Sequence, residues 1–146
     1  MTLIAILVAL MLGLLAALHA YWGLGGVWPG TDEKSCARAV AGFKGIDRMP
    51  PPPAAFGVAA ALAVAGLIAL ALAGLVTLPL PAALIWLGGL GAALVFLGRG
   101  VVGFTPVWRR ITPEMPFARN DRLYFSPLCL LIGAGFTLLL LQGPAA

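Results

Sequence analysis

Four side chains in this sequence could act as an acid, a base or an anion-binding group, namely His19, Arg99, Asp121 and Tyr124. Each lies near one end of a long apolar segment. Histidine, aspartate and tyrosine can act as general acids or bases. An arginine can hold an anionic headgroup through its fork of N–H donors. No recognisable nucleophile and base pair accompanies them, so the sequence favours a binding site over a catalytic one.

Arg99 lies near the end of the apolar segment 82–104, and two interpretations of it stay open. At about 1.5 Å per residue, a helix that begins at residue 82 places Arg99 roughly 26 Å along a ~30 Å hydrocarbon core. From there the side chain can reach the lipid headgroups without any further function. Because more apolar residues follow it, Arg99 can instead be embedded, and it then needs a carboxylate partner. Asp121 is the first candidate for a structural ion pair, and Glu114 is the second.

His19 is the single histidine of the chain and lies about one turn inside the end of the first apolar segment. No cysteine or carboxylate stands near it at ligand spacing, so we expect no metal site and no cofactor. A structural histidine at the interface is favoured over a proton carrier or ligand contact. Cys36 and Cys129 have no CxxC spacing, and a cytoplasmic location disfavours a disulfide between them.

Aromatic side chains gather at the same ends of the apolar segments as these polar groups. Their default explanation is an aromatic belt at the membrane–water interface, and the alternative is a cage around a ligand. The candidate ligand-binding residues are therefore His19, Tyr21, Trp22, Trp28, Arg99, Asp121 and Tyr124.

Four long apolar segments have to position these residues. The chain is 62% hydrophobic and 10% charged, with a mean hydropathy of +1.05, which exceeds what one globular core buries. A helix crosses the hydrocarbon core with about 20 apolar residues. The first segment has no Lys or Arg ahead of it, so we expect a retained helix and not a cleaved signal peptide. The sequence predicts an all-α integral membrane protein, a four-transmembrane-helix bundle in one domain over residues 1–146, with helices at approximately 2–22, 54–77, 82–104 and 124–142.

The basic residues predict the orientation of this bundle. All nine Lys and Arg and all five acids lie within or close to two loops, loop one (residues 23–53) and loop three (residues 105–123). Excess Lys and Arg in short loops marks the cytoplasmic face. We therefore expect both termini on the non-cytoplasmic side and a small cytoplasmic cap made by loops one and three. The formal charge of +4 would attract anionic headgroups, and it gives no support to nucleic-acid binding.

Three stretches of the sequence resemble a known family: HAYWGLGGVWPG (19–30), FLGRGVVGF (96–104) and PFARNDRLYFSPLCLLIG (116–133). They are similar to motifs of the bacterial four-helix membrane family catalogued as domain of unknown function 3995. Phe125 stands where the family pattern has Tyr, and Val102 and Gly103 depart from the pattern after Arg99, where an acidic partner is missing. The resemblance implies a small four-helix membrane protein without an assigned activity, which we expect in the bacterial inner membrane.

Two functions of different classes fit these features. The favoured one is a non-enzymatic protein that binds a lipid, a partner protein or a second copy of itself through a polar and aromatic site at its cytoplasmic face. The alternative is a small membrane-embedded enzyme acting on a lipid or isoprenoid substrate, with His19, Asp121 and Tyr124 as acid or base. In that enzyme Arg99 would hold the headgroup. Convergence of these side chains on one open cavity favours the enzyme or a ligand pocket, whereas a sealed pair of Arg99 and Asp121 without a cavity makes the motif structural.

Overall fold

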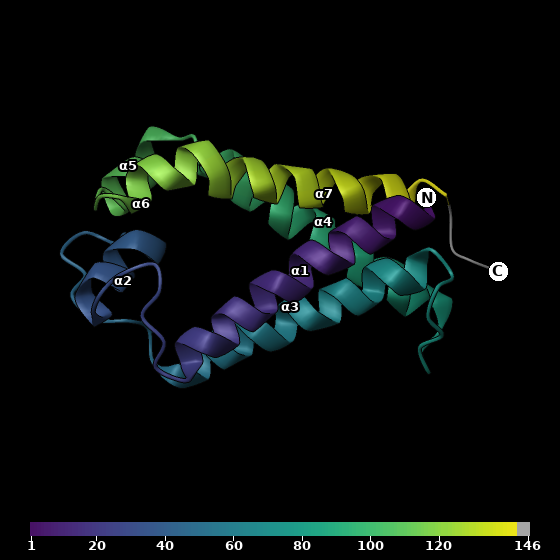
Figure 1. Ribbon diagram of the computed structural model, residues 1–146. Coiled ribbons are helices and arrows are strands. Elements are labelled where there is room, and N and C mark those ends of the chain that lie inside the picture. The colour runs from purple at the N-terminus through teal and green to yellow at the C-terminus, as the bar shows by residue number, and fades with distance from the viewer. Residues whose placement is uncertain (143–146) are drawn as a thin grey trace.

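The computed structural model describes residues 1–142 as helices joined by turns, with no strand in that range (Figure 1). Four of its helical segments are long and apolar enough to cross a membrane, as the sequence predicted. They are α1 (Thr2–Gly23), α3 (Pro52–Leu72), α4 (Ala82–Val102) and a composite segment, Phe117–Leu140.

The composite segment consists of α6 (Phe117–Asn120), a π-helical turn η1 (Asp121–Phe125) and α7 (Ser126–Leu140). It begins before residue 124, where the sequence placed its start. Pro127 explains the wide turn, because proline has no N–H to donate and its ring displaces the carbonyl four residues earlier. A π-helical turn accommodates both effects without ending the helix.

The end of α3 also differs from the sequence prediction. This helix ends at Leu72 and not near residue 77, because Gly74 follows with a φ of +70°. That left-handed conformation is available to glycine at little cost and commonly terminates helices. The apolar composition continues past Gly74, so hydropathy alone extended the predicted helix too far.

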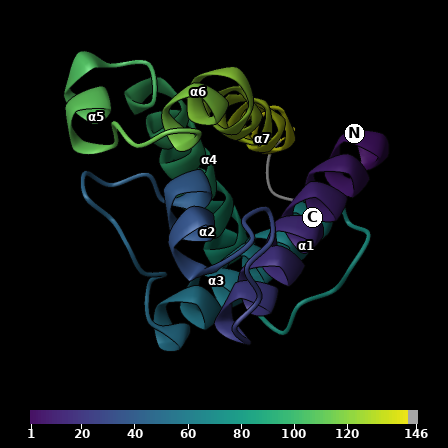
Figure 2. The ribbon, with the colours of Figure 1, turned by 60° about the vertical axis from the view of Figure 1, so that its left-hand side comes forward.

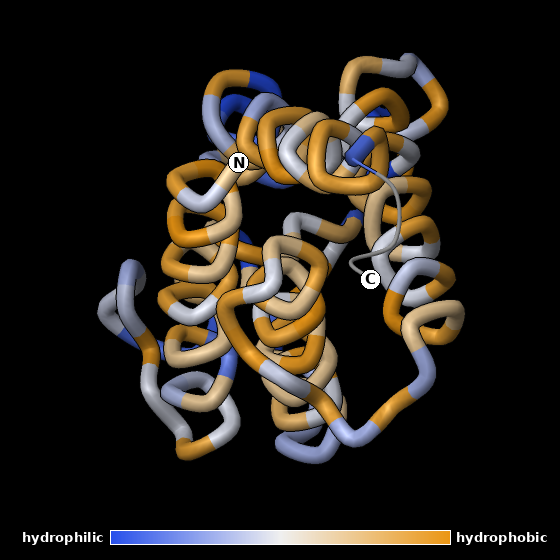
Figure 3. Tube along the Cα trace, turned by 90° about the vertical axis from the view of Figure 1, so that its right-hand side faces the viewer, coloured by the Kyte–Doolittle hydropathy of each residue, from blue (hydrophilic) through white to orange (hydrophobic). Residues whose placement is uncertain are grey.

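The long helices pack most closely in two pairs, α1 with α3 and α4 with α7 (Figure 1). α3 and α4 follow each other in the chain and also touch, although less extensively. The trace of all four is predominantly hydrophobic along its length (Figure 3). The N-terminus and the end of α7 lie at one end of the molecule, and the shorter helices lie at the other (Figure 1).

The buried core lies where the two pairs meet, in the half of the molecule that holds the N-terminus. Phe96 of α4 and Phe136 of α7 stack there, with ring centroids 6.3 Å apart and planes at 10°. The fully buried or nearly buried members of this core are Ala5, Val8, Leu12, Ala69, Leu72, Ala93, Ile132, Phe136 and Leu139. The second half of α1 contributes none of these residues, so its side chains are left for other contacts.

Loops one and three contact each other at the end opposite to the N-terminus. The backbone N–H of Lys44 donates to the carbonyl oxygen of Ile111 at 3.0 Å, and the backbone N–H of Glu114 donates to the carbonyl oxygen of Gly42 at 3.2 Å. Figure 2 shows the helix of loop one, α2 (Glu33–Val40), lying beside α6, and α5 (Pro106–Ile111) farther out in loop three.

The carboxylate of Glu114 strengthens this contact between the loops. It accepts a hydrogen bond from the backbone N–H of Gly45 at 2.9 Å, and it forms an ion pair with Arg38 Nε at 3.3 Å. Glu114 was the second candidate partner for Arg99. The structure pairs it with Arg38 and Gly45 of loop one instead.

The short helix α2 in loop one begins after Asp32, which is its N-cap. Asp32 Oδ1 accepts from the Ser35 backbone N–H at 2.7 Å, and Ser35 Oγ accepts from the Asp32 N–H at 3.1 Å. These two bonds form a capping box. The hydrogen bonds from Ser35 lower the pKa of the Asp32 carboxyl below its usual 3.8. The stability that this cap contributes is therefore complete above pH 3.8 and is lost as the pH falls through the lowered pKa.

Close packing of α4 on α7 is testable through Gly133→Ala. An added Cβ at Gly133 would lie 2.9 Å from the backbone nitrogen of Leu97, so we expect the free energy of unfolding to fall by about 1–3 kcal/mol. Thermal unfolding in detergent, followed by tryptophan fluorescence, measures the change. Gly91→Ala on α4 is the control, because nothing lies within 4 Å of a Cβ there. Equal melting temperatures for the two variants would contradict this packing.

Candidate functional site

Asp121 is fully buried at the start of the π-helical turn, and its carboxylate accepts hydrogen bonds from four side chains. Oδ1 accepts from Arg99 Nη2 at 2.6 Å and from Ser126 Oγ at 3.2 Å. Oδ2 accepts from Trp108 Nε1 at 3.0 Å and from Arg109 Nη2. Arg99 and Asp121 thus form an ion pair, and the half-buried guanidinium is directed at Asp121 and does not extend freely to lipid headgroups.

Arg99 makes two more contacts that fix its side chain. Its Nη1 donates to Ser126 Oγ at 3.3 Å, and its guanidinium carbon lies 4.8 Å from the ring centroid of Trp108, in a cation–π arrangement. Gly103 makes room for these contacts, because a Cβ there would overlap Ser126 Oγ and come within 3.0 Å of Arg99 Nη1.

These contacts leave the Asp121 carboxylate without a free position. An ionised carboxylate has about four lone-pair sites, and four donors occupy them. A general acid or base must reach the substrate with its own oxygen, and Asp121 cannot do this. We name Asp121 and its four donors the charge cluster: Arg99, Trp108, Arg109, Asp121 and Ser126.

Sequence reasoning missed three members of the charge cluster, namely Trp108, Arg109 and Ser126. The first two lie on α5, which Thr105 caps by accepting from the Trp108 N–H at 3.3 Å. Thr-Pro before Trp-Arg-Arg is a sequence signal for that helix start. Nothing in the sequence distinguishes Arg109 from the other loop arginines, because only the folded path of loop three aims it at Asp121.

The remaining candidates from the start of the chain gather at the end of α1. Trp22 Nε1 donates to the Trp28 carbonyl at 2.7 Å, and the Trp28 N–H donates to Tyr21 Oη at 3.4 Å. His19 packs edge-on against Trp22, with ring centroids 4.9 Å apart and planes at 71°. We name these four residues the aromatic group.

His19 is oriented by a backbone contact within α1. Its Nδ1 lies 2.7 Å from the Leu15 carbonyl oxygen. A carbonyl oxygen only accepts, so Nδ1 carries the hydrogen and donates. In the neutral ring, Nε2 is then left as a hydrogen-bond acceptor. This nitrogen is the one polar acceptor that the His19 ring can offer to a ligand.

The candidate residues therefore separate into two places. The aromatic group belongs to α1 and loop one, whereas Arg99 and Asp121 belong to α4 and the composite segment. Within residues 1–142 no side-chain hydrogen bond or ion pair joins the two places. Tyr124 of η1 belongs to neither, because 63% of it is exposed.

Two adjoining pockets lie beside the aromatic group. The inner pocket, of about 250 Å³, is lined by His19, Trp22, Val40, Ala41, Met49, Pro50, Ala54, Ala55 and Val58. The outer pocket, of about 390 Å³, is lined by Trp22, Gly25, Gly26, Val27, Glu33, Arg48, Met49, Pro50, Pro51 and Pro52. Trp22, Met49 and Pro50 line both, so these residues form a common wall. The inner pocket is apolar except for His19, and the outer pocket adds one positive and one negative side chain.

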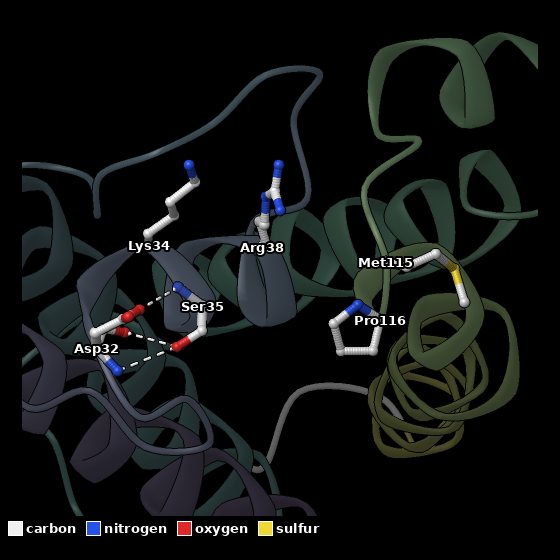
Figure 4. A pocket seen from close by; sticks show the side chains of 6 residues that line it. All are labelled: Asp32, Lys34, Ser35, Arg38, Met115 and Pro116. Atoms are coloured by element: carbon white, nitrogen blue, oxygen red, sulfur yellow. Dashed lines mark hydrogen bonds between the residues drawn. The ribbon is translucent and has the colours of Figure 1, made fainter.

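A third pocket, of about 290 Å³, lies between α2 and the segment that precedes α6 (Figure 4). Lys34 and Arg38 of α2 line one side of it, and Met115 and Pro116 line the other. Part of its charge is already engaged, since Arg38 pairs with Glu114. Asp32, which also lines it, is engaged as the cap of α2. We interpret this pocket as the cleft between two loops that hold each other.

Cys36 is buried in α2, and burial raises the pKa of its thiol above the usual 9.0. The thiol therefore stays protonated at neutral pH and is a poor nucleophile. Within residues 1–142, no group of three histidine, cysteine or acidic residues is placed to hold a metal ion.

A family model described as a protein of unknown function, DUF3995, matches residues 12–136, which is most of the chain. This match confirms the family resemblance seen in the sequence motifs. No curated protein and no solved structure matches the chain.

The variant Asp121→Asn tests the structural role of the charge cluster. It leaves Arg99 and Arg109 without their shared negative charge, and breaking a buried ion pair on one side costs about 3–5 kcal/mol. We expect a correspondingly lower melting temperature in detergent. Asp47→Asn removes the same charge from an exposed position and should leave the melting temperature within about 1 °C of the wild type. Unfolding curves that coincide for the two variants would show that the cluster contributes little.

Proposed function

This chain belongs to the DUF3995 family, and we propose that it is a non-enzymatic membrane protein that binds a single membrane lipid between α1, α3 and loop one. The observation that carries this proposal is the inner pocket beside His19 and Trp22. Ligand sites are typically concave, mostly apolar spaces of about 300–1000 Å³ with a few polar groups that fix orientation. The inner and outer pockets together have this size and character.

The position of the inner pocket along α3 suits a lipid chain. Val58 lies about 9 Å along the axis from the first residue of α3, at ~1.5 Å per residue. Pro52 and the neighbouring prolines line the outer pocket, at the very start of the same helix. In a bilayer this region corresponds to the boundary between headgroups and hydrocarbon. An acyl chain placed beside Val58 then has its headgroup at the level of the prolines.

Three observations favour binding over catalysis. The Asp121 carboxylate is surrounded by donors, His19 lies on a different helix pair from Asp121, and Tyr124 lines neither pocket. The enzyme alternative needs these side chains around one substrate. The described geometry instead separates the charge cluster, which joins helices, from His19 and Trp22 of the aromatic group, which line the pockets.

We place loops one and three at the cytoplasmic face of a bacterial inner membrane, with both termini on the other side. The support is the concentration of all nine Lys and Arg at this end of the molecule. Arg110, Arg119 and Arg122 of loop three and η1 are exposed. Each basic residue near an anionic leaflet is worth about 1 kcal/mol, so loop three would hold the protein against that surface.

Cysteine labelling tests this orientation. In a background with Cys36→Ser and Cys129→Ala, we place one cysteine either by Lys44→Cys in loop one or by Leu80→Cys in the turn between α3 and α4. A membrane-impermeant maleimide applied to intact spheroplasts should label the Leu80→Cys protein only, because its turn is expected outside. Lys44→Cys should react only after the membrane is opened. The reverse pattern would overturn the orientation.

Filling the inner pocket tests the lipid site. Ala55→Leu adds a bulky side chain to the pocket wall, and we expect the full chain to lose most of the lipid that co-purifies with the wild type. Native mass spectrometry from mild detergent measures the retained mass. Ala63→Leu is the matched control on α3, since Ala63 is exposed and lines none of the pockets described above. A wild type that retains no lipid, or equal retention by both variants, would contradict the proposal.

A further inference from the structure

The outer pocket contains one basic and one acidic side chain, Arg48 and Glu33, and this pairing indicates which headgroup it suits. We propose that the bound lipid is a zwitterionic aminophospholipid, whose phosphate contacts Arg48 and whose primary ammonium contacts Glu33. This inference rests on the proposed lipid-binding function and adds the chemical class of the ligand.

Glu33 is held in place at the outer pocket by the chain that lines it. Its Oε1 accepts from the backbone N–H of Met49 at 3.2 Å, and Met49 is itself part of the wall shared with the inner pocket. Within residues 1–142 no ion pair involves Glu33. The carboxylate is therefore fixed through one oxygen and keeps acceptor capacity for a ligand ammonium.

Arg48 directly precedes Met49, whose backbone N–H contacts Glu33, so Glu33 of α2 and Arg48 of the later part of loop one line the same pocket. Arg48 is exposed, and the ion pairs of the described residues do not include it. Its guanidinium can donate two hydrogen bonds to phosphate oxygens, which is the geometry that arginine favours for this group.

The charge balance of the outer pocket discriminates between lipid classes. A purely anionic headgroup would gain the Arg48 contact but would also lie near the Glu33 carboxylate, which repels it. A phosphoethanolamine-type headgroup carries a phosphate and an ammonium two carbons apart, so it complements both side chains. A trimethylated ammonium has no N–H to donate to Glu33, although Trp22 could still attract it through a cation–π contact.

The two adjoining pockets place the rest of the lipid. The headgroup lies in the outer pocket. One acyl chain runs from there along Trp22, Met49 and Pro50, which line both pockets, into the apolar inner pocket. The charged side chains that select the headgroup therefore lie in the outer pocket, and the inner pocket recognises only an apolar chain. Variants of the outer pocket should change which lipid is bound, whereas variants of the inner pocket should change how much lipid is bound.

Lipid competition on the full-length protein tests this inference. The purified chain in detergent is given an equimolar mixture of phosphatidylethanolamine, phosphatidylcholine and phosphatidylglycerol with identical acyl chains, and native mass spectrometry reads the bound species. We expect the ethanolamine lipid to dominate. Glu33→Gln keeps an oxygen for the Met49 N–H but loses the charge. Its preference for the ethanolamine lipid over the glycerol lipid should fall about tenfold, which corresponds to the loss of one charge-assisted hydrogen bond.

Arg48→Gln should weaken binding of all three lipids, because each contains the phosphate. Asp47→Asn and Lys44→Gln are matched controls in the same loop that line neither pocket, and both should keep the wild-type order. Preferential binding of phosphatidylglycerol or phosphatidylcholine by the wild type would overturn the headgroup assignment while leaving lipid binding intact. An unchanged lipid ratio in Glu33→Gln would overturn it as well. Absence of any bound lipid would instead overturn the proposed function itself.

Discussion

The buried carboxylate of Asp121 is the constraint on which one half of this structure depends. A charge removed from water needs donors around it, and here they come from α4, α5 and α7. The end of α4, the path of loop three and the start of the last long helix are therefore held together at one point. The same arrangement occupies the carboxylate completely, so a residue that looks catalytic in the sequence acts as a structural joint.

The other half of the molecule is organised by packing. α1 and α3 bury small and aliphatic side chains against α4 and α7 only near the N-terminal end of the bundle. At the opposite end, Glu114 joins loop three to loop one through Arg38 and Gly45. Between these two attachments, His19 and Trp22 are not used by the core. They line pockets instead, which is why the functional proposal belongs to α1 and α3.

The lipid site that we propose does not require a deep cavity. The long helices face hydrocarbon, so a bound acyl chain needs only a shallow apolar recess and specific contacts at the headgroup. Loop one contributes to both features, because Val40 and Ala41 line the inner pocket, and Glu33 of α2 and Arg48 line the outer pocket. Selectivity then depends on charged groups in water-accessible positions, where their hydrogen bonds can distinguish one headgroup from another.

Composition and hydropathy alone determined that four helices can span a membrane, because a bilayer core demands about 20 apolar residues wherever a helix crosses it. The family motifs and the pairing of Arg99 with Asp121 were also within reach of the sequence. Other features needed the tertiary structure. The left-handed Gly74 and the π-helical turn before Pro127 set the helix ends, since backbone conformation and not hydropathy decides them. Only the folded loops show that Arg109 meets Asp121, that Glu114 meets Arg38 and that Glu33 lines the same pocket as Arg48. These partners are distant in sequence, and a list of charged residues does not say which of them meet.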